Sequence, residues 1–451
     1  MLLETSSLTL LAEALRKLDA GFADLPAFDA LTPGADRMTE VLSDAAVRLQ
    51  DNYPYFHPLY AGQMLKPPHP VARAAYALAT WINPNNHALD GGRASTAMEM
   101  EAVAEIAAMF GWKTHLGHLT GGGTMANLEA LWVAGLVAPG KRICASAQAH
   151  YTHQRISEVL RLPFTKIPTD DHGRMDMSAL EGEASRGDLG CVVATLGTTG
   201  VGSVDPLPEI LRLREKYGFR VHVDGAYGGY FTLADNLAPP ARTAFDLIDR
   251  ADSIVIDPHK HGLQPYGCGC VLFRDPAIGT FYKHDSPFTY FSSRELHLGE
   301  ISMECSRPGA AAVALWATQR LLPLKPGGEF AGGLSASRRA ALQFTAHLKA
   351  DPRFAVPFDP ELDIVVWAPR AASASAASAE SQRIFDAAAH LQLHLAMTTV
   401  PVSFFAQAWP DLDKDRNGVL CLRSVMMKPE HEHWLDEIMQ RLSAATDTPR
   451  P

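Results

Sequence analysis

The chain has 451 residues, of which 47% are apolar and 20% are charged. It is therefore apolar enough to bury a large core and too weakly charged to be disordered. Fifty acidic residues against forty basic ones give a net charge of -10, which argues against a nucleic-acid backbone as the main partner. No apolar run reaches the roughly 18 residues of a membrane-spanning helix. We expect a soluble globular protein of about three compact units, at roughly 150 residues each.

The N-terminal residues predict an amphipathic helix rather than a secretory signal. Ser6 or Ser7 can cap a helix whose leucines at 8, 11, 15 and 18 keep helical spacing. Glu4 stands where a signal peptide is positive, and no small-residue cleavage site follows. The helix needs a partner surface to cover its apolar face. An irregular aromatic segment, NYPYFHPLY, comes next at 52–60.

Residues from about 61 to 320 alternate short β-rich runs with helical stretches, as an α/β domain around a mainly parallel sheet does. The six cysteines are widely spread, and Cys268-x-Cys270 has no second pair at zinc spacing, which favours reduced thiols in a cytoplasmic protein. The strands expected here are Ile143–Ala145, Cys191–Leu196, Val221–Asp224, Ser253–Ile256 and Cys268–Phe273.

A Pro/Gly-rich break at Leu322–Gly333 predicts a hinge into a smaller C-terminal unit. That unit has expected strands at Ile364–Trp367 and Val419–Arg423, while the low-complexity stretch Ala371–Ser381 predicts a mobile loop. The expected organisation is an N-terminal segment at 1–60, a large domain at 61–325 and a small domain at 326–451.

A glycine-rich turn opens one of the predicted helices. The sequence HLTGGGTMAN, from His118 to Asn127, places three glycines directly before a helical apolar pattern. Glycine lets the backbone approach a ligand closely, and a helix N-terminus offers free N–H groups and a positive dipole end. Such a turn suits a phosphate; a plain loop into a helix is the alternative. No Gly-Lys-Ser/Thr follows, so it is not a nucleotide P-loop.

Two further motifs place charged side chains after predicted strands. RVHVDGAYGG ends a strand at Asp224, and SIVIDPHKH places Lys260 shortly after the next strand. Positions beyond the carboxyl ends of parallel strands face a ligand in α/β folds. An unpaired buried carboxylate is costly, so Asp224 should face a cation. These two motifs alone leave two alternatives for the cation that faces Asp224. It belongs to a ligand, or it is Lys260 in a buried ion pair.

Two more segments add polar groups to the same edge. AQAHYTH contains His150 and His153, and ATLGTTG contains Thr199. The pairs His150 with His153 and His115 with His118 could be metal ligands, but no third ligand follows at a suitable spacing. All five motifs together suit pyridoxal phosphate (PLP), which needs a phosphate cradle, a lysine for its aldehyde and an aspartate for its pyridine nitrogen.

The order and wording of these motifs resemble the group II PLP-dependent decarboxylases, which include aromatic-amino-acid, glutamate and archaeal tyrosine/aspartate decarboxylases. HVDGAYGG followed by IDPHKHGLQPYGCG carries the resemblance, which covers about residues 53–423. NPNNHALDGG with TAMEMEAV is most similar to the archaeal branch. The resemblance implies a type I, aspartate aminotransferase-like α/β fold. That fold has a large domain with a mainly parallel seven-stranded sheet, a smaller C-terminal α+β domain and a homodimer with active sites at the interface.

The resemblance also implies a role for each motif residue. Lys260 would bind the cofactor aldehyde covalently, Asp224 would pair with the pyridine nitrogen, and His150 would stack on the ring and orient the substrate. These three are the expected catalytic residues. The other expected cofactor-binding residues are Gly123, Thr124 and Thr199 around the phosphate, Ala226 under the ring, and His259 beside the lysine.

Two departures from the family concern the substrate. Many relatives protonate the product with a loop tyrosine, whereas the matching stretch here, 292–300, contains none. Tyr290 and His297 are the candidates to replace it, and an aldehyde product is an alternative outcome. Arg93 stands where relatives have proline and could bind an acidic substrate; an ordinary surface arginine is the alternative. The expected substrate-side residues are Tyr60, Arg93, Tyr290, His297 and Arg423.

We therefore expect a cytoplasmic, homodimeric, PLP-dependent L-amino-acid decarboxylase that forms a primary amine and CO2. An aromatic substrate is slightly favoured over an acidic one. A carbon–carbon lyase, an aminotransferase and a non-catalytic relative are the alternatives. Ala226 with His150 matches decarboxylases better than aminotransferases, and a lyase of this type usually carries a membrane anchor, which we do not expect. No metal, membrane or nucleic-acid partner is expected.

Overall fold

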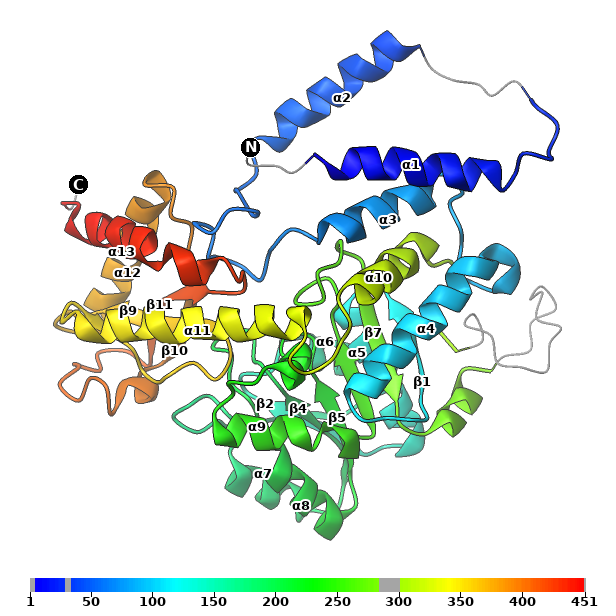
Figure 1. The fold of residues 1–451 in the computed structure, drawn as a ribbon. Helices are drawn as coiled ribbons and strands as arrows, with labels where there is room; N and C mark the ends of the chain where they lie inside the picture. Colours follow the sequence, from blue (N-terminus) through cyan, green and yellow to red (C-terminus); the bar gives the residue numbers. More distant parts are fainter. Residues whose placement is uncertain (1–4, 29–33, 284–300, 450–451) are drawn as a thin grey trace.

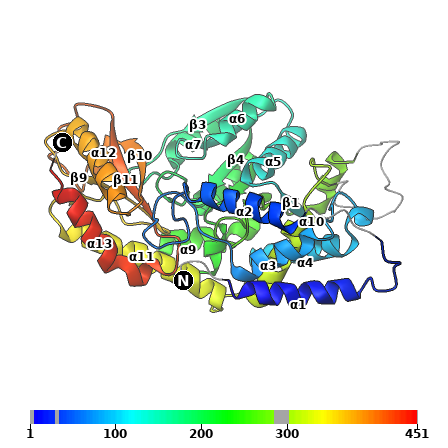
Figure 2. The same cartoon turned by 90° about the horizontal axis from the view of Figure 1, so that it is seen from above.

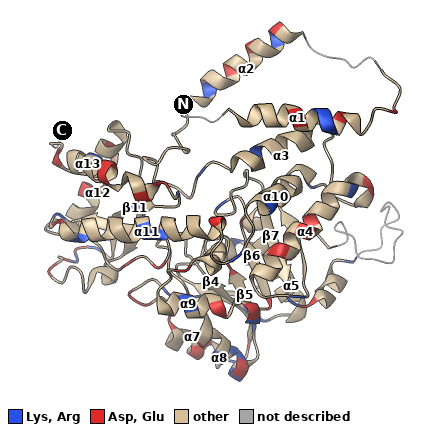
Figure 3. Ribbon diagram, in the orientation of Figure 1, with Lys and Arg blue, Asp and Glu red and all other residues tan. Residues whose placement is uncertain are grey.

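The computed structural model describes residues 5–28, 34–283 and 301–449. Two sheets organise this part of the chain, and Figures 1 and 2 show the C-terminal unit at one end of the molecule and the larger sheet beside it. Charged residues of both signs are interspersed over the helices, as Figure 3 shows. Within these ranges no helix is both long and apolar enough to cross a bilayer.

The larger sheet has seven strands in the order β1-β7-β6-β5-β4-β2-β3. Neighbouring strands from β3 to β6 pair in parallel, whereas β7 runs antiparallel to both β6 and β1. The expected mainly parallel seven-stranded sheet is therefore confirmed. Its strands are β1 (Leu116–Thr120), β2 (Arg142–Ser146), β3 (Phe164–Ile167), β4 (Leu189–Thr195), β5 (Arg220–Asp224), β6 (Ser253–Ile256) and β7 (Gly269–Phe273).

Two strands of this sheet escaped the sequence analysis. β1 contains Gly117 and His118 and so lacks an apolar run, and β3 is a four-residue strand at the sheet edge that is only partly buried. Strand β4, in contrast, is buried at every residue, as expected when helices cover both faces of a parallel sheet. The apolar sequence pattern therefore predicts a strand most clearly where all residues of the strand are buried.

Helices cover both faces of the larger sheet, whereas the first two helices of the chain lie farther from it (Figure 1). The N-terminal helix is confirmed, and it packs along α3. The helices that come before the C-terminal unit in the chain are α1 (Ser7–Ala20), α2 (Ala35–Leu49), α3 (Pro70–Thr80), α4 (Arg93–Met109), α5 (Gly123–Val137), α6 (Thr152–Val159), α7 (Met177–Ala184), α8 (Leu207–Tyr217), α9 (Pro239–Asp246) and α10 (Gly309–Leu321).

A four-stranded antiparallel sheet, in the order β10-β11-β9-β8, forms the C-terminal unit. Its core contains Trp367, Phe344 and Leu442. The predicted break at Leu322–Gly333 begins directly after α10 and includes the first residues of α11. The elements are α11 (Glu329–Ala350), β8 (Phe354–Ala355), β9 (Ile364–Pro369), α12 (Ala374–His390), β10 (Ala396–Pro401), β11 (Gly418–Val425) and α13 (His431–Asp447).

The prediction of a mobile loop at Ala371–Ser381 was wrong, because most of this stretch forms the first turns of α12. Ser373 caps the helix by accepting a hydrogen bond from the Ala376 N–H. Alanine is the best helix former, and the small residues Ala374, Ala377 and Ser378 are buried. The low complexity of the segment reflects a closely packed helix rather than a linker.

Parallel strands β4, β5 and β6 end at the same edge of the larger sheet. Thr195 is the last residue of β4, Asp224 is the last residue of β5, and Asp257 follows β6 directly. The register pairs Thr195 with Asp224 and Asp224 with Val255. The fold therefore gathers polar side chains at one edge, where α/β proteins bind ligands.

Gly228 lies at a close backbone approach behind this edge. A Cβ atom there would collide with the Leu196 carbonyl oxygen and lie 2.9 Å from Leu362 Cδ1. We expect G228A to lower the free energy of unfolding by about 1–3 kcal/mol, since overpacking strains a dense interior. Gly182 in α7 has open space around it, so G182A should stabilise by about 0.5–1 kcal/mol. Urea denaturation measures the free energy of unfolding of both variants. A G228A unfolding curve identical to that of the wild type would contradict the close packing at Gly228.

Candidate active site

A cavity of about 310 Å³ opens at the carboxyl ends of β4, β5 and β6. It brings together residues from motifs that are more than 100 positions apart in the chain. All eight residues expected to bind the cofactor line it: Gly123, Thr124, His150, Thr199, Asp224, Ala226, His259 and Lys260. The cofactor roles of these residues stay predictions, while their convergence is a feature of the fold.

The glycine-rich turn forms one side of the cavity and leads into α5. Gly122 has φ +147°, a backbone conformation that other residues rarely adopt, and Gly123 is the first residue of the helix. A Cβ atom on Gly123 would lie 2.7 Å from Asp257 Oδ2. The turn therefore has room for glycine only, and it leaves the first N–H groups of α5 at the cavity.

Asp224 is buried at the end of β5 and is held by two hydrogen bonds. Its Oδ2 lies 2.8 Å from His153 Nε2, and its Oδ1 accepts the Ala226 N–H at 3.0 Å. Burial alone would raise the pKa of Asp224, but the hydrogen bond and charge of His153 outweigh it and hold the pKa well below its ordinary value. Asp224 is thus an anion at neutral pH.

Lys260 lies on the turn that follows β6. Its Nζ lies 3.0 Å from Asp257 Oδ2, and its side chain is 21% exposed, so the ammonium can be reached from the cavity. The sequence left open a direct Asp224–Lys260 ion pair; in the structure each of these residues has a different partner. His259 Nδ1 accepts the Cys268 N–H at 3.3 Å, which ties the lysine turn to the start of β7.

His150 stands at the cavity before α6. Its Nδ1 lies 2.8 Å from Thr152 Oγ1, which fixes the ring orientation. Burial lowers the pKa of His150, and the charge of Asp224 opposes this only in part. The ring is therefore neutral at pH 7, a state suited to stacking on a flat ligand.

A second layer of hydrogen bonds holds the strands that carry these groups. His222 in β5 lies 2.8 Å from Asn127 Oδ1 in α5 through Nε2 and 2.8 Å from Ser253 Oγ in β6 through Nδ1. All three residues are buried. This arrangement fixes β5, β6 and the helix of the glycine turn relative to one another.

The expected substrate-side residues lie outside the cavity lining or outside the described residues. Arg93 is exposed at the first position of α4. Tyr60 and Arg423 are buried, and Arg423 lies within electrostatic reach of Tyr227 in the cavity wall. Tyr290 and His297 fall in 284–300, which is not described.

Three residues of the site were missed or given another role by the sequence analysis. His153 was considered only as a metal ligand, yet it pairs with Asp224. Asp257, which pairs with Lys260, and Tyr227, which lines the cavity, were not singled out. The signals were the i, i+3 spacing of His150 and His153 and the position of Asp257 three residues before the lysine.

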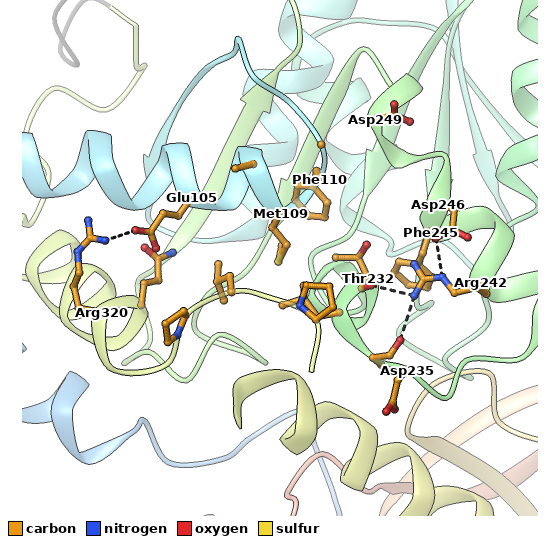
Figure 4. A pocket seen from close by; sticks show the side chains of 18 residues that line it. Glu105, Met109, Phe110, Thr232, Asp235, Arg242, Phe245, Asp246, Asp249 and Arg320 are labelled. Carbon is orange, nitrogen blue, oxygen red and sulfur yellow. Dashed lines mark hydrogen bonds and ion pairs between the residues drawn. The ribbon is translucent and has the colours of Figure 1, made fainter. Parts of the chain in front are cut away.

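A larger cavity of about 910 Å³ lies between the end of α4, α9 and the segment after α10 (Figure 4). Its two arginines are engaged, Arg242 with Asp246 and Arg320 with Glu105. No lysine, histidine or cysteine is among the described residues that line it. Without a lysine the larger cavity has no side chain that could attach PLP, whereas the smaller cavity contains Lys260.

Pyridoxal phosphate fits the smaller cavity. Asp257 Oδ1 and Thr195 Oγ1 are buried there and have no hydrogen-bond partner among the described residues. The turn at Gly123 has no space for a side chain of its own and offers backbone N–H groups for a phosphate. Beside it stand an accessible lysine and a buried anion, Asp224. Fold and site together define a PLP-dependent enzyme.

Comparison with known proteins places the chain within this class. The model of the pyridoxal-dependent decarboxylase conserved domain matches residues 141–369. An L-tyrosine decarboxylase of Enterococcus faecium is 30% identical over 436 residues, covering 72% of this chain and 71% of that protein. The chain belongs to the pyridoxal-dependent decarboxylase family, and the resemblance seen in its motifs is confirmed. It is a PLP-dependent amino acid decarboxylase.

Two further groups of proteins are similar. A probable L-tyrosine/L-aspartate decarboxylase of the archaeon Methanopyrus kandleri is 29% identical, covering 60% of this chain and 72% of that protein. The crystal structure of mouse CSAD in apo form shares the fold with a TM-score of 0.78 at 18% identity, covering 96% and 92% of the two chains. A Catharanthus roseus tryptophan decarboxylase structure has a TM-score of 0.75 at 18% identity over 99% of both chains.

The pairing of His153 with Asp224 makes a test of the site. H153L would leave a buried carboxylate unpaired, and we expect it to lower the free energy of unfolding at pH 7 by about 3–5 kcal/mol and to weaken PLP binding. Because the pKa of Asp224 is depressed in the fold, its stabilising contribution is present above the unfolded pKa of about 4 and is lost as the pH falls further. The deficit of H153L should therefore shrink in acid.

Urea denaturation at several pH values and fluorescence titration with PLP measure these effects. H172L, at an exposed histidine, is the control and should match the wild type. Equal stability of H153L and wild type at pH 7 would contradict the role given to His153.

Proposed function

We propose that the enzyme decarboxylates an aromatic L-amino acid to its primary amine and CO2 in the cavity at Lys260. The observation that carries this proposal is the convergence of Lys260, Asp224 and His150 on one cavity beside a glycine turn. An acidic substrate is the second candidate, because the archaeal relatives are named as tyrosine/aspartate decarboxylases.

Each side chain of the cavity has a distinct proposed task. When bound, PLP supplies an electron-accepting ring for the electrons of the bond that is cleaved. Lys260 would hold the cofactor through its aldehyde group. Asp224, an anion with a lowered pKa, would hold a proton on the pyridine nitrogen and so make the bound ring a better electron acceptor. The turn at Gly123 and Thr124 binds the phosphate through backbone N–H groups.

His150, Ala226 and the cavity wall position the substrate. His150 is neutral and its ring is oriented by Thr152, so it can cover one face of a flat cofactor. Ala226 is small and 9% exposed, which leaves space for the other face. With the ring held between them, the substrate carboxylate can be set perpendicular to the ring plane, the geometry that decarboxylation requires.

The aromatic preference rests on the relatives and on residues near Arg423. The Enterococcus relative is named an L-tyrosine decarboxylase. Tyr53, Tyr55 and Tyr60 pack together, with ring centroids of Tyr55 and Tyr60 5.0 Å apart. Arg423 has Nε and Nη2 without hydrogen-bond partners among the described residues, and we assign it to the substrate side together with Tyr60. Arg93, which is exposed, is the residue that would support an acidic substrate.

The proposal predicts the outcome of a substrate panel. The PLP-loaded protein should convert one aromatic L-amino acid to the amine with release of CO2. K260A should lose turnover by at least about 10⁴-fold, because no other lysine is among the described residues that line the cavity. Mass spectrometry of amine, aldehyde and keto-acid products measures this. Turnover of aspartate or glutamate alone would replace the aromatic assignment, and aldehyde without amine would overturn the reaction type.

A variant at Arg93 separates the two substrate classes. R93A should leave turnover of an aromatic substrate within about twofold, whereas a role in binding an acidic side chain would raise KM for that substrate by about tenfold or more. Multiple turnover by K260A at the wild-type rate would reject Lys260 as the attachment site.

We also propose that the protein works as a homodimer in the cytoplasm. Helix α2 has no buried residue, and Met38, Val41 and Leu42 are 48%, 59% and 66% exposed. Figure 1 shows α2 standing away from the rest of the chain. An apolar face of this kind needs a cover, and a second copy supplies it. All six cysteines lie within the described residues and are free thiols, which supports a reducing compartment. Cell fractionation checks that assignment.

The dimer proposal predicts that charges on α2 break the assembly. Sedimentation should give the wild type twice the chain mass of 48.9 kDa, and V41D/L42D should shift it toward the monomer. D44A, at an exposed polar residue of the same helix, is the control. A monomeric wild type at micromolar concentration would reject the proposal.

A further inference from the structure

A buried carboxylate of the C-terminal unit reaches the wall of the active-site cavity. Asp363, the residue before β9, accepts a hydrogen bond from Tyr227 Oη at 2.6 Å, and its Oδ2 lies 3.2 Å from His261 Nε2. Tyr227 is 3% exposed, and the side chains of His261 and Asp363 are fully buried. One side chain of the small sheet thus contacts two residues of the large sheet unit.

Both contacted residues adjoin the proposed cofactor groups. Tyr227 lines the cavity, and His261 follows Lys260 directly in the chain. Their rings pack edge to face with centroids 4.8 Å apart, and His261 also packs on Phe231 at 5.0 Å. A shift of Asp363 would therefore move the cavity wall and the backbone next to the lysine together.

The charge states of the three groups agree with a hydrogen-bonding role. Burial alone would raise the pKa of Asp363, but His261, Tyr227 and Lys66 outweigh it and lower the pKa. Burial lowers the pKa of His261 despite the nearby carboxylate, and burial raises the pKa of Tyr227 well above its ordinary value. An anionic acceptor therefore faces a neutral histidine and a protonated tyrosine.

The C-terminal unit also fixes Asp363 from its own side. The Met426 N–H donates to the Asp363 carbonyl oxygen at 2.8 Å, which ties the residue to the end of β11. Arg423 of β11 and Lys66 of the segment before α3 provide the positive charges within electrostatic reach. The carboxylate is held on both sides and has little freedom to move.

We propose that Asp363 is a positioning residue. It fixes the positions of the Tyr227 and His261 side chains and, through them, the position of Lys260 in the cavity. This inference rests on the proposed role of Lys260 as the cofactor attachment site. It assigns the C-terminal unit a task in cofactor binding although none of the described residues of that unit lines the cavity. No bond is made or broken by Asp363.

The experiment compares three variants of the full chain. D363A removes both contacts. D363N keeps an oxygen for Tyr227, and its amide can donate to His261 because His261 Nδ1 has no hydrogen-bond partner among the described residues and can take the ring proton. E361A is the matched control, since Glu361 lies two residues away and accepts the Val204 N–H at 2.7 Å but does not line the cavity.

The readouts are the PLP dissociation constant, the induced circular dichroism of bound PLP, and the melting temperature without PLP. We expect D363A to weaken PLP binding about tenfold and reduce the induced signal, consistent with the loss of a hydrogen bond to a charged acceptor. D363N should stay within about threefold of the wild type. E361A should lower the melting temperature while leaving PLP affinity and the induced signal unchanged.

A double-mutant cycle separates positioning from general destabilisation. If Asp363 acts through Tyr227, D363A should weaken PLP binding less in a Y227F background than in the wild type. Equal effects in both backgrounds, or D363A indistinguishable from E361A, would overturn the proposal. D363N binding PLP as weakly as D363A would also overturn it, because charge and not geometry would then be responsible.

The parent assignment is tested separately with K260A. If K260A still forms a covalent adduct with PLP, trapped by borohydride, the cofactor site itself is misassigned. If K260A loses the adduct while D363A binds PLP normally, only the role of Asp363 fails.

Discussion

The hydrogen bond between His153 and Asp224 is the interaction on which the site depends. A carboxylate at the end of a buried strand is unstable unless a donor compensates for lost hydration. His153, at the start of α6, supplies that donor at 2.8 Å and holds the carboxylate in its anionic form. This hydrogen bond offsets the free-energy cost of removing the carboxylate from water, and it keeps the negative charge beside the cavity.

The parallel sheet explains why the remaining groups meet there. Strands β4, β5 and β6 run in one direction and are buried on both faces, so only their ends can present polar side chains to a ligand. The glycine turn before α5 reaches the same edge, and the hydrogen bonds of His222 to Asn127 and Ser253 hold helix and strands in register. The polar side chains of the site therefore lie at the edge where the parallel strands all end.

Much of this arrangement could be predicted from local signals in the sequence. Apolar runs marked β2, β4, β5 and β6, and the residues after them marked the cavity, because strand ends are visible in sequence as a change from apolar to polar residues. The partners within the site could not be predicted in this way. The two motifs left an Asp224–Lys260 ion pair open as an alternative, whereas the structure pairs Asp224 with His153 and Lys260 with Asp257. Strand β1 was missed because Gly117 interrupts its apolar pattern. Helix α12 was missed because its small residues form a low-complexity sequence, although several of them are buried in close packing.

The contact of Asp363 with Tyr227 and His261 has a consequence for protein engineering. The two sheet units cannot be treated as independent modules, since a buried hydrogen bond crosses between them at the cavity wall. A chimera that joins the C-terminal unit of one family member to the large unit of another must transplant positions 227, 261 and 363 as a matched set. Otherwise the hybrid carries an orphaned buried carboxylate at its own domain junction.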